Sequence, residues 1–223
     1  MNFSLPLPAN SVIAQPSVLL VFAKAPRSGS VKTRIAATLG DERALEIYRT
    51  LGSHVVSRLA ELPSPVKIAC TPDEAGGELT GWLGTHLGIE GQGDGDLGAR
   101  LERCIARELA AGAERAMVIG MDCPEISAPL VAEAFRALDS NDVVFGPAFD
   151  GGYYLVGVHR RARAALPALF REIPWSSRLT LAVTLAAAKR VGLTVALIKT
   201  LSDIDTEQDW LDWQQRVASA GLP

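Results

Sequence analysis

Four cationic side chains lie in one short stretch near the start of the chain, and their type favours anion binding. The stretch contains Lys24, Arg27, Lys32 and Arg34 with one proline and one glycine. Such side chains pair with phosphate oxygens, and loop N–H groups add donors. It is neither a Walker A loop, because Val31 rather than glycine precedes Lys32, nor a G-x-G-x-x-G turn. We therefore predict a phosphate or diphosphate site here, the alternative being a solvated basic loop.

Carboxylates form the second chemically promising group, because several follow apolar runs. Asp122, Asp150 and Asp205 each come shortly after such a run, and Asp203 lies beside Asp205. If the runs are parallel strands, their carboxyl ends and the basic stretch share one edge of a sheet. Carboxylates there could hold Mg²⁺ or Mn²⁺, which binds phosphate oxygens in turn. We predict Asp122 and Asp205 as metal ligands, whereas Asp203 could simply cap a turn.

The hydrophobic pattern predicts a scaffold that brings these segments together. Residues 18–23 are an unbroken apolar run, typical of a strand buried on both faces of a parallel sheet. Residues 41–62 carry apolar side chains at spacings of three and four, as on one face of an amphipathic helix. Strand-like and helix-like segments alternate to the end, so we predict an α/β fold whose mainly parallel mixed sheet has helices on both faces. Further strands are expected at 66–71, 116–121, 142–148, 153–158 and 194–201, and further helices at 78–87, 100–111, 127–138, 162–170, 178–191 and 206–220.

Composition narrows the class of protein. The 223 residues suit one domain over 17–223, preceded by a proline-broken flexible tail over 1–16. A net charge of −3 disfavours nucleic-acid partners, and no apolar run approaches the roughly 20 residues of a membrane span. Three cysteines without a C-x-x-C disfavour disulfides and zinc and favour the cytoplasm. Cys123 has no nearby histidine, so we expect a small buried residue rather than a nucleophile.

Six motifs occur in order over most of the chain: FAKAPRSGSVKTR, GDLGARL, IGMDCP, GPAFDGGYYLVGV, IPWSS and LSDIDTEQD. Together they resemble the bacterial glycosyltransferase-A-like family of candidate nucleotide-diphospho-sugar transferases, often called radical-SAM/selenodomain-associated transferases. More distantly, they are similar to guanylyltransferases that activate phospholactate or the molybdenum cofactor. The resemblance implies a single-domain, Rossmann-like nucleotide-diphospho-sugar transferase (GT-A) fold. It also implies a nucleotide-sugar or nucleoside triphosphate donor and a small-molecule acceptor, and it is compatible with a homodimer.

The resemblance also assigns roles to positions of this chain. Lys24, Lys32 and Arg34 match positions that meet nucleotide phosphates, and Asp122 and Asp205 match the metal-binding acids. Two further groups are expected to bind the donor and acceptor. The first, near the base or ribose, is Gly95, Asp96, Leu97 and Gly98, and the second, on the acceptor side, is Asp150, Gly151, Gly152, Tyr153, Trp175 and Ser176. If the acceptor hydroxyl needs a general base, we expect Asp150 to serve.

Two departures from related patterns bear on the reaction. Nucleotidyltransferases begin with a glycine-rich loop such as A-G-G-x-G-x-R, whereas residues 25–27 here are Ala-Pro-Arg. Asp122 also stands without the second carboxylate of a D-x-D element. We therefore expect glycosyl transfer, with nucleotidyl transfer or a non-catalytic nucleotide-binding module as alternatives. An NAD-dependent Rossmann enzyme is disfavoured, because no glycine fingerprint follows the first strand.

Overall fold

The computed structural model describes residues 16–220, and this part of the chain is built on one seven-stranded mixed sheet. The order across the sheet is β3-β2-β1-β4-β6-β5-β7. The predicted tail, apart from Pro16, falls outside the described residues. The strands are β1 (Ser17–Lys24), β2 (Val66–Thr71), β3 (Gly88–Gly91), β4 (Arg115–Ile119), β5 (Val143–Pro147), β6 (Tyr153–His159) and β7 (Val195–Leu197).

The predicted mixed, mainly parallel sheet is confirmed. β3, β2, β1 and β4 run parallel, and β7 runs parallel to β5. β6 alone is antiparallel, to β4 on one side and β5 on the other. A tight turn at Asp150-Gly151-Gly152 joins β5 to β6, as the sequence predicted. The carboxyl ends of β1 and β4 therefore meet at the same edge of the sheet.

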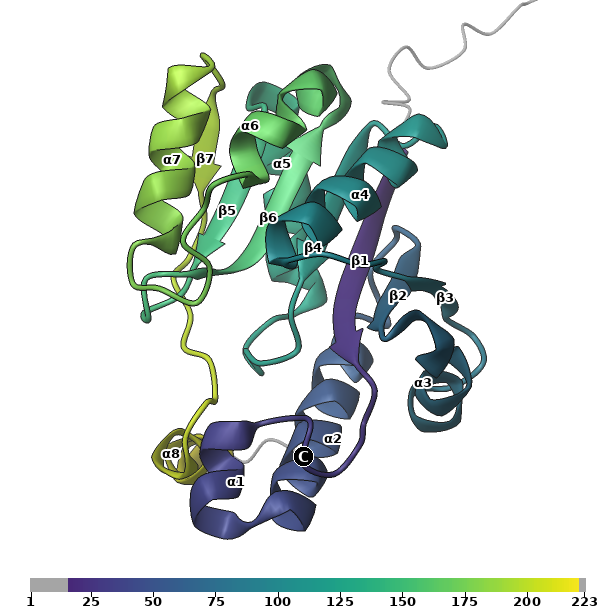
Figure 1. Ribbon diagram of the computed structural model, residues 1–223, viewed down its shortest axis with the longest axis vertical. Helices are drawn as coiled ribbons and strands as arrows, with labels where there is room; N and C mark the ends of the chain where they lie inside the picture. The colour runs from purple at the N-terminus through teal and green to yellow at the C-terminus, as the bar shows by residue number, and fades with distance from the viewer. Residues whose placement is uncertain (1–15, 221–223) are drawn as a thin grey trace, which may run out of the picture.

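Helices cover both faces of the sheet. Alternate residues of β1 point to opposite faces, so each face has apolar side chains for the helices to cover. Leu19 and Val21 pack in a core with α2, α3 and α5, whereas Val18 and Leu20 pack in another with α4, α6 and α7. In Figure 1, α4 crosses in front of the sheet. The helices are α1 (Thr33–Leu39), α2 (Asp41–Ser57), α3 (Gly76–Leu83), α4 (Leu97–Ala110), α5 (Ala128–Ser140), α6 (Leu166–Phe170), α7 (Thr180–Arg190) and α8 (Glu207–Ala220), with 3₁₀ turns η1 (Asp73–Ala75) and η2 (Arg160–Ala165).

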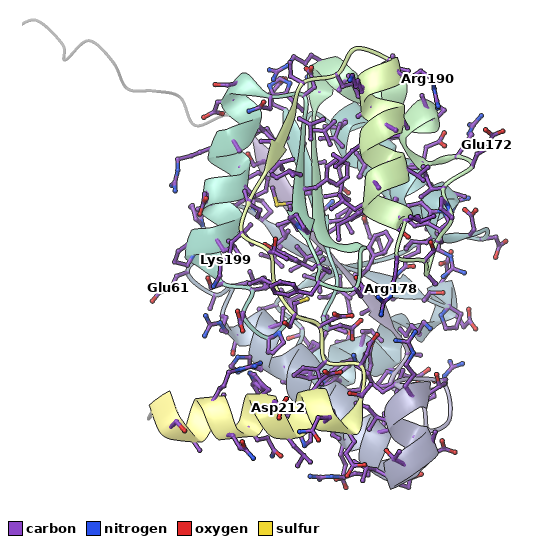
Figure 2. The ribbon with its side chains drawn as sticks, turned by 90° about the vertical axis from the view of Figure 1, so that its left-hand side faces the viewer. Glu61, Glu172, Arg178, Arg190, Lys199 and Asp212 are labelled. Carbon is purple, nitrogen blue, oxygen red and sulfur yellow. The ribbon has the colours of Figure 1, made fainter. Side chains whose placement is uncertain are left out.

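A third, smaller core lies beyond the carboxyl end of β1, where α1, α2 and α8 meet (Figure 1). It is formed by Ile35, Ile47, Ile204 and Trp210 with their neighbours. Figure 2 shows α8, marked by Asp212, lying across the lower end of the molecule, with α7 above it. The chain from β7 to α8 passes the carboxyl ends of β5 and β4, since Leu201 bridges to Ala148 and Ile204 N donates to the Asp122 carbonyl. This core joins the predicted phosphate loop to the segment that carries Asp205.

Three elements differ from the sequence-based prediction. The short helix α1 was missed, because its seven residues follow directly on a loop with proline and glycine. The last strand, expected over 194–201, is ordered as a strand only over Val195–Leu197. The helix expected after the glycine-rich stretch begins earlier, at Leu97. Among the described residues, no helix combines the length and apolar character that crossing a bilayer requires.

Candidate functional site

A cleft of about 760 Å³ opens at the carboxyl edge of the sheet and is lined by segments from both halves of the chain. Most of the predicted site residues border it, and these are Lys24, Lys32, Arg34, Gly95, Asp96, Leu97, Asp122, Asp150, Gly152, Tyr153, Trp175, Ser176 and Asp205. Asp203 borders it as well, whereas Arg27, Gly98 and Gly151 do not line it. The fold therefore brings the basic stretch and the predicted acids into one cavity.

Lys32 lies at the centre of this arrangement. Its ammonium group is in ion-pair contact with Asp122 Oδ1, lies 3.4 Å from Asp205 Oδ1, and donates to the backbone carbonyl of Ile204. The Lys32 side chain is only 5% exposed, whereas that of Asp122 is 50% exposed. Arg34 adds a second cation, with Nη1 3.1 Å from Asp205 Oδ2. Lys32 thus bridges Asp122 and Asp205, the two carboxylates that the sequence predicted as metal ligands.

Local packing explains how these groups are held. Val31 and Ile35, which precede and follow Lys32, are both buried, and their packing anchors this part of the loop to the core. Lys32 itself adopts a left-handed conformation (φ 48°, ψ 47°), which turns the chain into α1. On the opposite side, the N–H of Ile204 donates to the carbonyl of Asp122 at 2.9 Å. This hydrogen bond ties the segment before α8 to the end of β4.

The acids of the cleft lie close enough to influence one another. Burial, followed by the negative charges of Asp205, Asp150 and Asp122, raises the pKa of Asp203 to about 6. Asp150 is exposed, and its Oδ1 accepts a hydrogen bond from Gly152 N at 2.8 Å. This Asx turn orients the carboxylate and leaves Oδ2 free of that bond. Besides the two bridged acids, the cleft thus contains Asp150 and Asp203, which have no lysine partner among the described ion pairs.

Part of the basic loop is engaged in contacts within the protein. The N–H groups of Ala25, Arg27 and Ser30 all donate to backbone carbonyls. The Arg27 guanidinium turns away from the cleft and pairs with Glu78, with Nη2 2.6 Å from Oε1. Arg27 thus does not line the cleft in this structure, and its role in donor binding stays a prediction. Its pairing with Glu78 could not be read from sequence, because the two residues are 51 positions apart.

The glycine-rich stretch forms a helix N-terminus rather than an open loop. Its run from Gly93 to Gly98 has the spacing G-x-G-x-x-G between β3 and α4. However, the side chain of Asp96 caps α4 by accepting from Ala99 N at 2.8 Å, so a carboxylate already occupies the position that a phosphate would take. Leu97 is 43% exposed at the cleft, whereas Gly98 is buried.

Gly98 and Gly151 are needed for packing rather than for direct lining. A Cβ on Gly98 would lie 2.1 Å from the carbonyl oxygen of Phe170 and 3.0 Å from the Trp175 ring. Gly151 has φ +93°, and a Cβ there would lie 2.2 Å from the Arg178 carbonyl oxygen. The lack of a Cβ at Gly98 therefore lets the start of α4 lie against the Phe170 carbonyl. At Gly151 it lets the turn before β6 lie against the Arg178 carbonyl.

Two aromatic side chains, Tyr153 and Trp175, line the part of the cleft where the acceptor was predicted to bind. Tyr153 and Trp175 pack edge to face, with ring centroids 6.2 Å apart. The indole Nε1 of Trp175 is buried without a hydrogen-bond partner. A buried donor without a partner costs stability, so a ligand acceptor or an ordered water would be favourable there.

The polar side chains of the cleft that were missed include Tyr48, Thr71, Gln92 and Arg100. Arg100 donates to Thr71 Oγ1 at 3.1 Å and to the carbonyl of Gly95 at 2.9 Å. Gln92 is only 3% exposed and donates to the Ala69 carbonyl at 2.7 Å. The position of Arg100, one turn after the Asp96 cap, was a usable signal. The burial of Gln92 depends on tertiary packing, so it could not be predicted from the sequence.

The donor set is compatible with a hard divalent cation. Within residues 16–220 no three His, Cys, Asp or Glu side chains are already arranged around one metal position. Mg²⁺, however, often binds through one or two carboxylates and completes its shell with waters and phosphate oxygens. Asp122 and Asp205 would supply the carboxylate oxygens, and both side chains already contact the Lys32 ammonium group. Cys123, the neighbour of Asp122, is 2% exposed, as expected for a small buried residue.

Comparisons with known proteins agree with this fold. The family model described as "Uncharacterized protein conserved in bacteria (DUF2064)" matches residues 55–177. A crystal structure of a candidate nucleotide-diphospho-sugar transferase from Desulfovibrio desulfuricans G20 has a TM-score of 0.85 and 30% identity, covering 91% of this chain and 88% of that chain. No curated protein matches the chain.

More distant structures share the fold. A cytidylyltransferase from Leptospira borgpetersenii serovar Hardjo-bovis (strain JB197) has a TM-score of 0.61 and 14% identity, covering 92% of this chain and 87% of that chain. The 4-diphosphocytidyl-2C-methyl-D-erythritol synthase from Anaerococcus prevotii DSM 20548 has a TM-score of 0.59 and 12% identity, covering 92% of this chain and 99% of that chain. The predicted fold class is thereby confirmed.

Proposed function

Because the chain belongs to the bacterial family DUF2064, whose fold it shares with the Desulfovibrio protein, we propose that it is a metal-dependent transferase that moves a glycosyl group from a nucleotide-diphospho-sugar to a small acceptor. The observation that carries this proposal is the bridge from Lys32 to Asp122 and Asp205. It places a cation and two carboxylates at the strand ends where this class of sheet binds ligands.

Charge stabilisation is the main task of such a site. Lys24 and Arg34 border the cleft and would neutralise the departing nucleoside diphosphate together with Lys32. Asp122 and Asp205 would hold the divalent cation, which when bound would offset further negative charge on the diphosphate. On the acceptor side, the exposed carboxylate of Asp150 would accept the proton of the attacking hydroxyl. Leu97 and the residues around it would contact the base or ribose.

We prefer glycosyl over nucleotidyl transfer because the basic loop has Ala-Pro-Arg at residues 25–27 where nucleotidyltransferases have a glycine-rich turn. A nucleotidyltransferase must stabilise a departing pyrophosphate, and glycine-rich loops do so with unengaged N–H groups. Here the N–H groups of Ala25, Arg27 and Ser30 are already bonded, and Arg27 pairs with Glu78. Nucleotidyl transfer remains the second candidate, supported by the cytidylyltransferases that share the fold.

A thermal-shift panel tests the donor class. Nucleoside diphosphate sugars and nucleoside triphosphates are added with and without Mn²⁺. A sugar nucleotide at about 100 times its Kd stabilises the native state by about 2.7 kcal/mol, or about 5–10 °C for a chain of this length. We expect such a shift only with Mn²⁺. Absence of a shift with every compound would refute the donor site.

Product analysis separates the two reactions. Glycosyl transfer releases a nucleoside diphosphate, whereas nucleotidyl transfer releases pyrophosphate. Asp122→Asn should remove the Mn²⁺ dependence of the donor shift, because it removes a predicted metal ligand. The matched control is Asp212→Asn on α8 (Figure 2), because Asp212 accepts a hydrogen bond from Gln208 and does not line the cleft. Retained Mn²⁺ dependence in Asp122→Asn would show that another carboxylate binds the metal.

A further inference from the structure

Three protein oxygens surround the Lys32 ammonium group in this structure. A lysine has three N–H donors. Lys32 donates to Asp205 Oδ1 and to the carbonyl of Ile204, and it forms an ion pair with Asp122 Oδ1. The Lys32 side chain is only 5% exposed. A donor phosphate that bound this ammonium group would compete with these three oxygens for it.

The two carboxylates are equally engaged. Each carboxylate contacts Lys32 through its Oδ1 atom, so a divalent cation bound to these same two atoms would take the place of the ammonium group. A metal ion and an ammonium group in the same position would repel each other strongly at this distance. The metal can therefore bind these two oxygens only when Lys32 leaves them.

The surroundings allow such a movement. The Asp122 side chain is 50% exposed and can be reached from the cleft. Asp205 would keep a cationic partner without Lys32, because Arg34 lies 3.1 Å from its other oxygen. The four-carbon stem of lysine has several rotatable bonds, and the cleft of about 760 Å³ leaves room for them. A donor diphosphate would supply new acceptors for the released ammonium group.

We propose that Lys32 is an exchangeable internal cation, which occupies the Asp122–Asp205 site until donor and metal bind and then moves to the donor phosphates. The proposal rests on the proposed function for the identity of the donor, but not for the competition itself. Two consequences follow: the metal alone binds weakly, because it must displace Lys32, and donor and metal strengthen each other's binding. Lys32 thereby couples the two binding events.

The first test measures Mn²⁺ affinity without nucleotide, from the electron paramagnetic resonance signal of free Mn²⁺. Lys32→Met should bind Mn²⁺ about ten- to hundredfold more tightly than the unmodified chain, the range of a charge-assisted hydrogen bond. The control is Lys24→Met, which removes an equal charge from the same cleft without touching either carboxylate. Equal or weaker binding by Lys32→Met, or an equal gain in Lys24→Met, would overturn the exchange.

A second test uses the unmodified chain and so does not depend on how a variant folds. An amine-acetylating reagent and mass spectrometry give the reaction rate of each lysine. Lys32 should react slowly without metal, and saturating Mn²⁺ should raise its rate at least about tenfold. Lys199, whose side chain is 69% exposed, serves as the internal reference and should not change. Unchanged slow reaction of Lys32 while Mn²⁺ is bound would overturn the proposal.

The two proposals can fail separately. If no nucleotide shifts the melting temperature but Lys32→Met gains Mn²⁺ affinity, the donor assignment is wrong and the competition stands. If a sugar nucleotide binds with Mn²⁺ while Lys32 neither limits Mn²⁺ affinity nor changes reactivity, the proposed function stands and the exchange is refuted. If no form of the chain binds Mn²⁺ even with nucleotide, the exchange is refuted as well.

Discussion

Replacing Gly98 with alanine should destabilise the chain, although alanine is the better helix former. The added Cβ would lie 2.1 Å from the Phe170 carbonyl oxygen, against about 3.3 Å for a close C–H···O contact. Because that oxygen belongs to the backbone, no side-chain rotation can relieve the overlap. The start of α4 must move by about 1 Å relative to α6 and Trp175.

The expected magnitude follows from two opposing terms. Overpacking a buried position costs about 1–3 kcal/mol. Gly→Ala in a helix returns up to about 1 kcal/mol, and less here, because Gly98 is the second residue of α4. The net loss is about 1–2 kcal/mol, which lowers the melting temperature of a chain of this size by about 2–8 °C.

Thermal and guanidinium unfolding, followed by circular dichroism, measure this loss. The matched control is Gly81→Ala in α3, where an added Cβ meets nothing within 4 Å. The control should gain about 0.5–1 kcal/mol from helix propensity alone. A Gly98→Ala chain that is as stable as the original, or more so, would refute the close contact between α4 and the Phe170 carbonyl.

Three further predictions concern single side chains. Burial lowers the pKa of His159 below its usual value, so its stabilising contribution is complete above about pH 6.5 and is lost as the pH falls through the folded pKa. His159→Asn keeps an acceptor for Arg161 N, so its guanidinium unfolding free energy should fall less between about pH 7.5 and pH 5 than that of the original chain; an equal fall would contradict this. Burial also raises the pKa of the Cys104 thiol to about 11, so iodoacetamide at about pH 8 should modify it only after unfolding, as mass spectrometry would show. Asp209→Ala removes the carboxylate that accepts from Thr206 N and Oγ1, at 2.8 and 2.7 Å, and should cost about 1–2 kcal/mol in chemical unfolding.

The fold was predictable because its signals are local. The apolar run of β1 and the alternation of strand-like and helix-like segments indicated the sheet, and the turn at residues 150–152 indicated the antiparallel strand. The common position of Lys32, Asp122 and Asp205 was also predictable, since each follows a strand that ends at one edge.

Features that depend on distant contacts were not predictable. The outward turn of Arg27 depends on Glu78, and the role of Gly98 depends on a carbonyl 72 positions later, at Phe170. The sequence also could not show that Lys32 itself lies between the two acids, because both lysine and metal satisfy the same charge pattern. Only the geometry distinguishes a phosphate ligand from a counter-ion.

The bridge from Lys32 to the segment before α8 has a consequence for biosynthesis. Lys32 and Ile204 are separated by 172 positions, so the cleft cannot close while the chain is still being translated up to α7. Contacts of such long range form late, because the loop between them must be closed first. The β1–β4 half can pack while the nascent chain is still attached to the ribosome, but its lysine and its Asp122 then lack their third partner. Ligand-binding competence should therefore appear only once the segment before α8 has left the ribosome, after β1 and β4 have paired.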